Sequence, residues 1–247
     1  MPKQFRADLH IHTCLSPCAD ITMSPLRIVN KAVERGLDII AITDHNSAEN
    51  TAAAVRSVRD MNLFVLTGME VTSSEEAHIL ALFDNIESIL RLQDTVYRNM
   101  TAGENVERLF GEQVVANEND EVMGFNKRLL IGATNMSANS IVTEIHSLGG
   151  LAIASHIDRD AFSILSQLGF IPDDVSFDAL ELSSAISRKK AEELYETYDS
   201  FTWISSSDAH AIDDIGKRTT LFHMNDSSIE EMRMALKSIN GRKVEWE

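Results

Sequence analysis

Short apolar runs alternate with amphipathic segments along most of the chain. The apolar runs have the length of strands and are bounded by polar or turn residues, which is typical of buried β-strands. They predict strands at 5–12, 37–44, 63–71, 78–83, 151–157, 178–183 and 201–206, with a further candidate at 219–224. Helical patterns lie near 48–60, 86–100, 138–148, 160–167, 187–198 and 227–239. A further helix is expected to begin at Ser24 and Pro25 and to end at Gly36.

This alternation predicts the fold class. Buried strands that alternate with helices are typical of a parallel sheet covered by helices. The 247 residues, 44% of them hydrophobic, are compatible with one large α/β domain such as a barrel. Between residues 101 and 135 the alternation is lost, and we expect an inserted arm with a short hairpin and loops. The prediction is a single domain over residues 1–247 that carries this arm.

Polar residues interrupt the apolar strands at particular places. In "RADLHIHT" the first strand has Asp8, His10 and His12 at alternate positions, so the three side chains are expected to share one face. Later strands end or begin with acids and histidines, in "ITDHN", "GMEVT", "EAHIL", "LAIASHIDR" and "ISSSDAH". Six of the eight histidines occupy such positions, whereas His146 and His223 do not and are expected to be structural. Because the carboxyl ends of parallel strands converge on one rim, the six should meet there.

Nine candidate metal ligands would gather at this rim. They are His10, His12, His45, His78, His156, His210, Glu70, Asp208 and, from the loop after the first strand, Asp20. A buried polar group without a partner costs roughly 2–7 kcal/mol, and divalent cations would satisfy such a cluster. Catalytic zinc typically has about three protein ligands and an open position, so nine ligands suit three ions with one bridging carboxylate. The alternative is a cluster of hydrogen-bonded histidines, although serine–histidine or cysteine–histidine catalysis needs far fewer imidazoles.

Charge and cysteine content bear on partners and location. The formal net charge of −16 disfavours binding of a polynucleotide, although a local basic patch is compatible with it. Two cysteines, Cys14 and Cys18, make no disulfide framework and favour a reducing compartment. The start "MPKQFRADLHIH" lacks the apolar core of a secretory signal, and no apolar run has the length of a membrane span. We therefore expect a soluble, cytoplasmic protein whose oligomeric state the sequence does not predict.

The ordered set of motifs is similar to that of a known family. "DLHIHT", "TDHN", "GMEVT", "EAHIL", "ASHIDR" and "SSDAH", which span residues 8 to 210, resemble the signature segments of the PHP (polymerase and histidinol phosphatase) superfamily of metal-dependent phosphoesterases. The resemblance implies a distorted (β/α)7 barrel with three metal ions at the C-terminal rim of the strands. The ions would be zinc, iron or manganese, because histidine and carboxylate ligands suit all three.

The resemblance also implies a set of ligands for each ion. It assigns His10, His12, Glu70 and Asp208 to the first ion, the bridging Glu70 with His78 and His156 to the second, and Asp20, His45 and His210 to the third. Asp20 departs from the family spacing, because "CLSPCA" lengthens the gap after the paired histidines. The distance from Asp20 to the Ser-Pro helix start in "DITMSP" is nevertheless typical of the family.

Phosphoester hydrolysis is the activity that the resemblance implies. Bound metals lower the pKa of water to about 7, and a hydroxide bridging two ions could attack phosphorus in line while the metals stabilise the developing charge. The expected substrate is a small phosphomonoester or a nucleotide phosphate. Arg159 is the candidate phosphate clamp, with Lys217 and Arg218 as a weaker second candidate. Asp208 or a metal-bound water is the candidate general acid.

Four other polar residues lie near the candidate ligands. Asp8 and Asp44 are placed to orient a ligating imidazole. Cys14 and Cys18 have a spacing that permits thiolate ligation, but the histidines and carboxylates already fill the three sites, so ordinary loop thiols are expected. Neither pair changes the predicted chemistry.

Three other functions remain open. A nuclease acting on the ends of single-stranded nucleic acid would share the metal site but would need a basic track, which the charge of −16 disfavours. A non-catalytic regulatory module could use the arm at 101–135 to bind a partner, but it would not need a full set of ligands. Hydrolysis of a C–N bond is chemically compatible with the same ligands.

Overall fold

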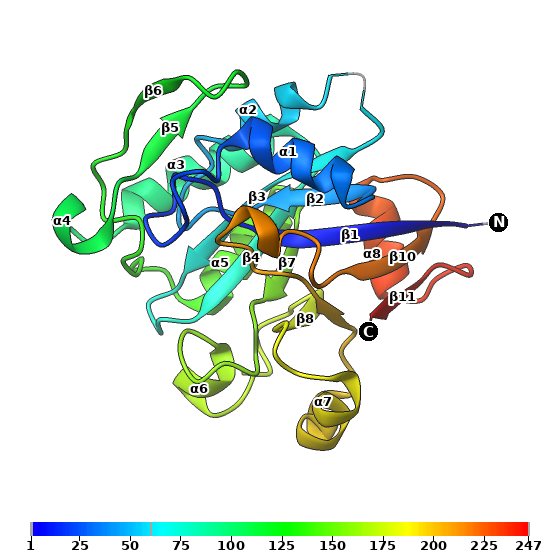
Figure 1. The fold of residues 1–247 in the computed structure, drawn as a ribbon. Coiled ribbons are helices and arrows are strands. Elements are labelled where there is room, and N and C mark those ends of the chain that lie inside the picture. Colours follow the sequence, from blue (N-terminus) through cyan, green and yellow to red (C-terminus); the bar gives the residue numbers. More distant parts are fainter. Residues whose placement is uncertain (1, 60, 247) are drawn as a thin grey trace.

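The computed structural model describes residues 2–59 and 61–246. Its main sheet has nine strands: β1 (Lys3–Ile11), β2 (Ile39–Ile42), β3 (Phe64–Thr72), β4 (His78–Phe83), β7 (Leu151–Ala154), β8 (Ala179–Leu182), β9 (Trp203–Ser205), β10 (Thr220–Met224) and β11 (Lys243–Trp246). They are hydrogen-bonded in the order β11-β10-β1-β2-β3-β4-β7-β8-β9, and the sheet curls into a nearly closed barrel (Figure 1). The strands at its two ends, β9 and β11, contact each other. This architecture confirms the predicted α/β class and the distorted barrel.

Two strands depart from the expected parallel arrangement. Strands β1, β2 and β3 are parallel, as are β7, β8 and β9, but β4 is antiparallel to both of its neighbours and β10 is antiparallel to β1. The turn between β3 and β4 is only a few residues long, which is too short for a parallel crossover. His78, the first residue of β4, therefore pairs with Thr72 at the end of β3. It lies at the rim that carries the carboxyl ends of the parallel strands.

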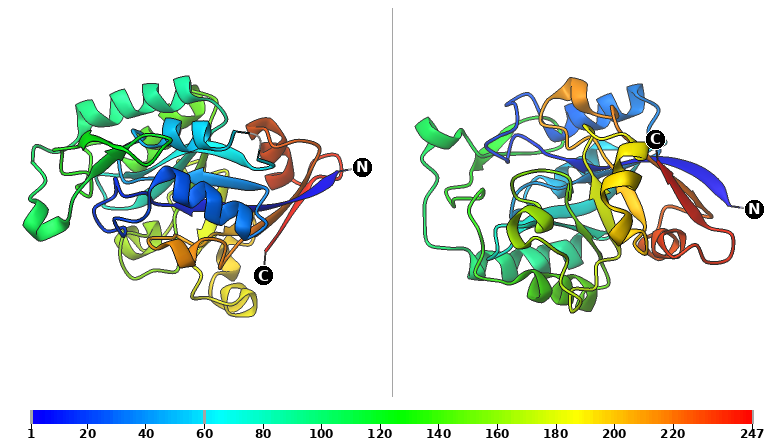
Figure 2. Two further views of the ribbon diagram at one scale, coloured as in Figure 1. Left: turned by 45° about the horizontal axis from the view of Figure 1, so that its top comes forward. Right: turned by 90° about the horizontal axis from the view of Figure 1, so that it is seen from below.

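Helices pack around the barrel (Figure 2): α1 (Pro25–Glu34), α2 (Thr51–Ser57), α3 (Ile86–Asn99), α5 (Ala138–Ser147), α6 (Ile164–Leu168), α7 (Arg188–Leu194) and α8 (Ile229–Leu236), with short 3-10 turns η1 (Glu196–Tyr198) and η2 (Ile212–Asp214). As predicted, α1 begins after an extended Ser24 with Pro25 in its first turn, and Gly36 follows its end with a positive φ of 66°. The helix expected near 48–60 is the shorter α2, and residue 60 lies outside the described residues. No described helix is long and apolar enough to cross a bilayer.

The buried side chains divide between the inside and the outside of the barrel. Leu9, Leu66 and Phe222 belong to the interior cluster, and α8 packs against this cluster with Met232. On the outer face, α1 and α2 pack against the alternate residues of β2, including Ile40. Burying one such side chain contributes about 1.5–3 kcal/mol. The rim is therefore built on strands that are buried on both faces.

Residues 101–135 form a peripheral segment beside the barrel (Figure 1). It contains the short helix α4 (Glu107–Phe110) and a separate two-stranded antiparallel sheet of β5 (Val114–Ala116) and β6 (Val122–Phe125). The backbone N–H of Val114 donates to the carbonyl of Cys14, and the Asn50 side chain bonds to Val114 and Ala116. These contacts hold the segment against the loop after β1 and the start of α2.

Candidate metal centre

Eight of the nine predicted ligands lie together at the rim where the parallel strands end. They are His10, His12, His45, Glu70, His78, His156, Asp208 and His210. Seven of them are buried, and His210 is partly exposed. A cavity of about 580 Å³ opens over the group. The strand order of the barrel thus gathers side chains that are up to two hundred residues apart in the sequence.

Glu70 lies at the centre of the cluster. Its Oε1 is 3.1 Å from His78 Nδ1 and 3.3 Å from both His10 Nε2 and His156 Nε2, and its Oε2 is 3.1 Å from His45 Nδ1 and 3.5 Å from His12 Nε2. Burial by itself would raise the pKa of Glu70, but the imidazoles of His78 and His10 hold that pKa well below its usual range. Five imidazoles around one buried carboxylate are the arrangement expected of a bridging metal ligand.

The Asp208 side chain is the second carboxylate of the site. Its Oδ1 lies 3.2 Å from His12 Nε2 and 3.3 Å from His10 Nε2, and its Oδ2 lies 2.6 Å from Arg159 Nη2. Asp208 and His156 both have a positive φ, of 50° and 27°. Left-handed backbone at non-glycine residues costs of order 1–3 kcal/mol and is often found at functional sites. The fold maintains that strain at two residues of the cluster.

Asp8 does not share the surroundings of His10 and His12, so that prediction is wrong. The register between β1 and β2 shifts between Asp8 and Ile11, which interrupts the alternation of faces. The Asp8 carboxylate instead accepts hydrogen bonds from the backbone N–H groups of Ser207, at 3.0 Å, and Gly216, at 2.8 Å. It positions the loop that carries Asp208 rather than an imidazole.

Glu181, a residue that sequence reasoning missed, supports the site from beneath. It is buried in β8, and its Oε2 is 2.9 Å from His10 Nδ1 and accepts from the backbone N–H of His156 at 3.1 Å. A carboxylate that accepts from Nδ1 leaves Nε2 of His10 with its lone pair toward the cluster. The sequence feature that could have indicated Glu181 is an acid within the otherwise apolar strand "DALELS".

Asp44 acts on an imidazole through an intervening serine. Its carboxylate accepts from the hydroxyls of Thr13 and Ser16 and from the backbone N–H of Thr13, each at 2.7 Å. Ser16 Oγ lies 3.0 Å from His12 Nδ1 and accepts from the backbone N–H of His45 at 3.2 Å. Because Ser16 donates to Asp44, it accepts from His12, and Nε2 of His12 faces the site with a free lone pair.

Asp20 is the one predicted ligand that the structure does not bring into the cluster. Its side chain is exposed, and its Oδ1 accepts from the backbone N–H of Thr22 at 2.8 Å, because an aspartate readily closes a turn with the residue two positions later. Cys18, an exposed residue, lines the cavity together with His45 and His210. Partial desolvation opposes ionisation of this thiol, but the imidazoles of His210 and His45 lower its pKa to about 6.

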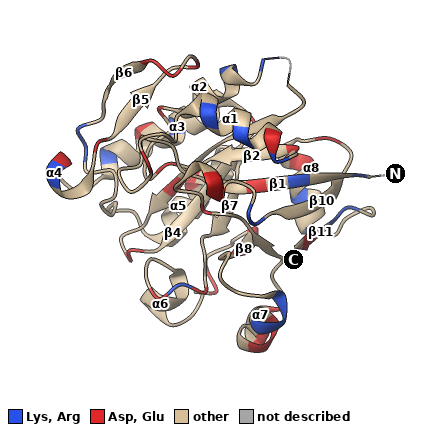
Figure 3. Cartoon of the chain, in the orientation of Figure 1, with Lys and Arg blue, Asp and Glu red and all other residues tan. Residues whose placement is uncertain are grey.

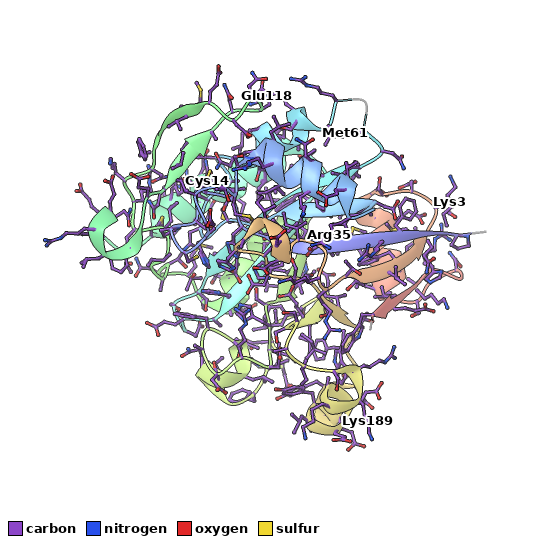
Figure 4. The ribbon with its side chains drawn as sticks, viewed as in Figure 1. Lys3, Cys14, Arg35, Met61, Glu118 and Lys189 are labelled. Carbon is purple, nitrogen blue, oxygen red and sulfur yellow. The ribbon has the colours of Figure 1, made fainter. Side chains whose placement is uncertain are left out.

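The second cysteine is buried away from the cavity. Cys14 packs with Val114 and Ala116 of the peripheral segment, and its thiol lies 3.7 Å from the Val114 carbonyl (labelled in Figure 4). Burial raises the pKa of Cys14 to about 12. Only one of the two thiols therefore faces the cluster.

The candidate phosphate-binding residues have different surroundings. Arg159 lines the cavity, is exposed and pairs with Asp208 rather than with the adjacent Asp158 or Asp160. Lys217 pairs with Asp214 at 2.6 Å. Arg159 is thus the candidate that reaches the cluster.

The histidines expected to be structural lie elsewhere. His146 Nε2 is 2.8 Å from an oxygen of Asp178, and His223 Nε2 is 3.4 Å from an oxygen of Glu245. Neither belongs to a group of potential metal ligands among the described residues.

The donor set fits divalent metal ions. Three groups have ligand atoms within 4.8 Å of one another: His10, His12 and Asp208; His45, Glu70 and His78; and His12, His45 and His210. Several buried atoms in these groups have no hydrogen bond within the described chain, including Glu70 Oε1, Asp208 Oδ1 and the Nδ1 atoms of His45 and His78. Unsatisfied buried donors and acceptors are costly, and coordination would satisfy them together.

Two family models match the sequence: the PHP domain model over residues 8–198 and the PHP-associated model over residues 185–239. A 5'-3' exoribonuclease of Haemophilus influenzae is 28% identical over 78 residues, which are 30% of this chain and 27% of that enzyme. The lesion-specific endonuclease PfuEndoQ from Pyrococcus furiosus superposes with a TM-score of 0.77 at 20% identity, covering 98% of this chain and 58% of its own. A Bifidobacterium adolescentis structure, provisionally described as a metal-dependent phosphoesterase, has a TM-score of 0.63 at 19% identity, with 94% and 96% covered.

The curated relatives are longer than the matched region. The match spans 60% of the protein MJ1587 of Methanocaldococcus jannaschii, at 26% identity over 112 residues, and a smaller share of the exoribonuclease. The chain therefore spans less than two thirds of the length of these relatives. At identities of 19–20%, the solved structures share the fold with this chain.

Proposed function

The chain belongs to the PHP domain family, and on that premise we propose that it is a metal-dependent phosphoesterase that hydrolyses a small phosphomonoester or a nucleotide phosphate. One observation carries the proposal: five imidazoles surround the buried carboxylate of Glu70 beneath an open cavity. We further propose three ions per chain, chosen from zinc, iron and manganese according to availability.

The residues of the chain prepare the site for those ions. When bound, divalent ions supply Lewis acidity that acidifies water and neutralises charge on phosphoryl oxygens. Glu181 holds Nδ1 of His10, and Ser16 holds Nδ1 of His12, so both rings present Nε2 to the cluster. Fixing the tautomers in advance means that no ring has to reorient when the site fills.

Arg159 is placed to bind the phosphate. One guanidinium nitrogen contacts Asp208 at 2.6 Å, and Arg159 lines the cavity together with His156. A guanidinium has five N–H donors in a planar fork, so pairing with Asp208 leaves donors for phosphoryl oxygens. Asp208 thereby positions Arg159, and its part as general acid stays a prediction.

A substrate screen with matched variants tests the proposal. Metal-free protein would be reconstituted with Zn²⁺, Mn²⁺ or Fe²⁺ and assayed against p-nitrophenyl phosphate and a panel of sugar phosphates and nucleotides. We expect metal-dependent phosphate release that His156→Ala reduces by at least about 10²-fold, consistent with loss of metal-assisted catalysis. His223 pairs with Glu245 and is not one of the clustered ligands, so His223→Ala should release phosphate at the wild-type rate. If no metal-replete preparation cleaves any phosphoester, the proposal fails.

A second candidate function is cleavage of a polynucleotide. Five cationic side chains line a separate cavity of about 750 Å³: Arg6, Arg188, Lys217, Arg218 and Lys243. In the view of Figure 3, the Lys and Arg residues of the described chain are interspersed with Asp and Glu. The exoribonuclease and the endonuclease among the related proteins support this candidate. It predicts salt-sensitive digestion of single-stranded DNA or RNA that weakens in Lys217→Glu, whereas hydrolysis of p-nitrophenyl phosphate is unaffected by that change.

A further inference from the structure

The loop between β7 and α6 supplies three different side chains to the cavity over the cluster. His156, Arg159 and Phe162 line this cavity at intervals of three residues. The backbone N–H of Arg159 donates to the His156 carbonyl at 2.9 Å, and the Ser163 hydroxyl donates to the Arg159 carbonyl at 2.8 Å. These bonds hold the loop together, so that an imidazole, a guanidinium and a phenyl ring reach the same space.

The Phe162 ring lies against one of the predicted metal ligands. It stacks on the ring of His78, with the ring centroids 4.8 Å apart and an angle of 13° between the two planes. The backbone N–H of His78 also donates to the Phe162 carbonyl at 2.8 Å. Phe162 has a positive φ of 58°, which is uncommon for a bulky residue and is often found at functional sites. The loop therefore maintains an unfavourable backbone conformation that places this ring beside the cluster.

Stacking on His78 leaves much of the Phe162 side chain uncovered. Phe162 is 44% exposed, and Ala161 and Ile131, the latter from the peripheral segment, line the same cavity. The cavity thus combines apolar side chains with the cluster and Arg159, and its volume of about 580 Å³ is typical of a site for a small organic ligand. Aromatic rings stack in offset parallel arrangements, so a planar ring in a ligand would cover the exposed phenyl group. A sugar phosphate has no such ring.

We propose that Phe162 determines specificity and that the substrate is a nucleoside monophosphate, whose base stacks on the Phe162 ring while its phosphate reaches the cluster and Arg159. Every base has a π-face, so the ring selects nucleotides over sugar phosphates without selecting one particular base. The inference rests on the proposed function and narrows its substrate class from small phosphomonoesters in general to nucleotides.

Binding of unreactive analogues tests the stacking without relying on hydrolysis. The phosphonate analogues of adenosine 5'-monophosphate and of ribose 5-phosphate share the anionic group and the sugar, but only the first has a base. Isothermal titration calorimetry of Zn²⁺-loaded protein should give an affinity for the adenosine analogue that is about 5–150-fold higher than for the ribose analogue, as expected for one stacked base. Equal affinities, or no binding of either analogue, would overturn the inference.

Variants of Phe162 assign the preference to this ring. Phe162→Leu, which keeps an apolar group over His78 but has no flat face, should lose the preference at wild-type metal content, whereas Phe162→Tyr should keep it. Phe170, which is 57% exposed and is not among the described residues that line the cavity, provides the control, and Phe170→Ala should bind both analogues as wild type does. A preference that survives in Phe162→Leu contradicts the assignment. If Phe162→Leu loses bound metal together with the preference, Phe162 only positions His78 and the inference is again overturned.

Steady-state kinetics separate this inference from the proposed function. Phe162→Leu should raise the KM for adenosine 5'-monophosphate by about 5–150-fold and leave the KM for ribose 5-phosphate unchanged. If the analogues bind with the expected preference but no phosphoester is cleaved, the proposed function fails and the role of Phe162 in binding stands. If wild type hydrolyses the nucleotide and the sugar phosphate with the same kcat/KM, the inference fails alone.

Discussion

Replacing Glu181 by glutamine tests how the buried second layer of the site controls metal binding. The amide oxygen can occupy the place of Oε2 and still accept from His10 Nδ1 and the His156 backbone. The amide NH2 then takes the place of Oε1, which has no hydrogen-bond partner in the described chain. Burying that group without an acceptor costs about 1–3 kcal/mol of folding free energy. The shape of the site survives, but the negative charge beneath His10 is lost.

The expected effect on metal binding follows from that lost charge. Carboxylates that orient a ligating histidine are worth about 10–100-fold in metal affinity or activity, which corresponds to about 1.4–2.7 kcal/mol. Competition with a chromophoric chelator would measure the affinity, and urea denaturation would measure the free energy of unfolding. Glu192→Gln, on the exposed surface of α7, is the control. If both Glu181→Gln and Glu181→Ala bind metal as tightly as wild type, Glu181 does not orient His10 and the reasoning is wrong.

Three further predictions concern residues in the strands and loops of the barrel. Gly68→Ala should destabilise the protein by about 1–3 kcal/mol in urea denaturation, because a Cβ would lie 2.8 Å from the Ile42 carbonyl and 3.0 Å from that of Ala81; unchanged stability would contradict this. Ser16→Ala should lower metal affinity by about 10-fold through loss of the acceptor for His12, and an affinity equal to wild type would show that Ser16 is dispensable. Burial would raise the pKa of Asp178, but hydrogen bonds from His146 and the Ala152 backbone hold it below 3.8. The ionised Asp178 therefore contributes to the free energy of unfolding above about pH 3.8, and this contribution is lost as the pH falls through the lower pKa of the folded state. Asp178→Asn should therefore make the free energy of unfolding depend less steeply on pH in the acid range. A dependence as steep as that of wild type would refute this role of Asp178.

Much of the cluster could be predicted from the sequence because strand ends converge in a barrel. His45, Glu70 and His156 each follow or end an apolar run. Histidines and acids at the carboxyl ends of buried barrel strands indicate a functional site. His78 also lies at the rim, as predicted, although its strand runs antiparallel. Because β4 runs in the opposite direction, its first residue lies at the rim where the parallel strands end.

The structure departs from the sequence prediction where side-chain direction depends on local backbone geometry. The register shift in β1 separates Asp8 from His10, and no residue pattern in "RADLHIHT" marks it. Asp20 has a suitable type and spacing, but a turn hydrogen bond to Thr22 captures its carboxylate. Glu181 lies within an apolar strand, and only the pairing of β7 with β8 shows that it meets His10. Such contacts depend on the tertiary structure rather than on the order of residues.

Metal occupancy measured together with phosphoester hydrolysis tests the central claim most directly. Metal-free protein would be titrated with Zn²⁺ or Mn²⁺, and bound metal and the release of p-nitrophenol from p-nitrophenyl phosphate would be recorded in the same samples. We predict that hydrolysis rises with bound metal and that Glu70→Gln loses both, whereas His223→Ala keeps both. Protein that remains metal-free at saturating ion concentrations, or that hydrolyses the ester equally well after chelation, would contradict the claim.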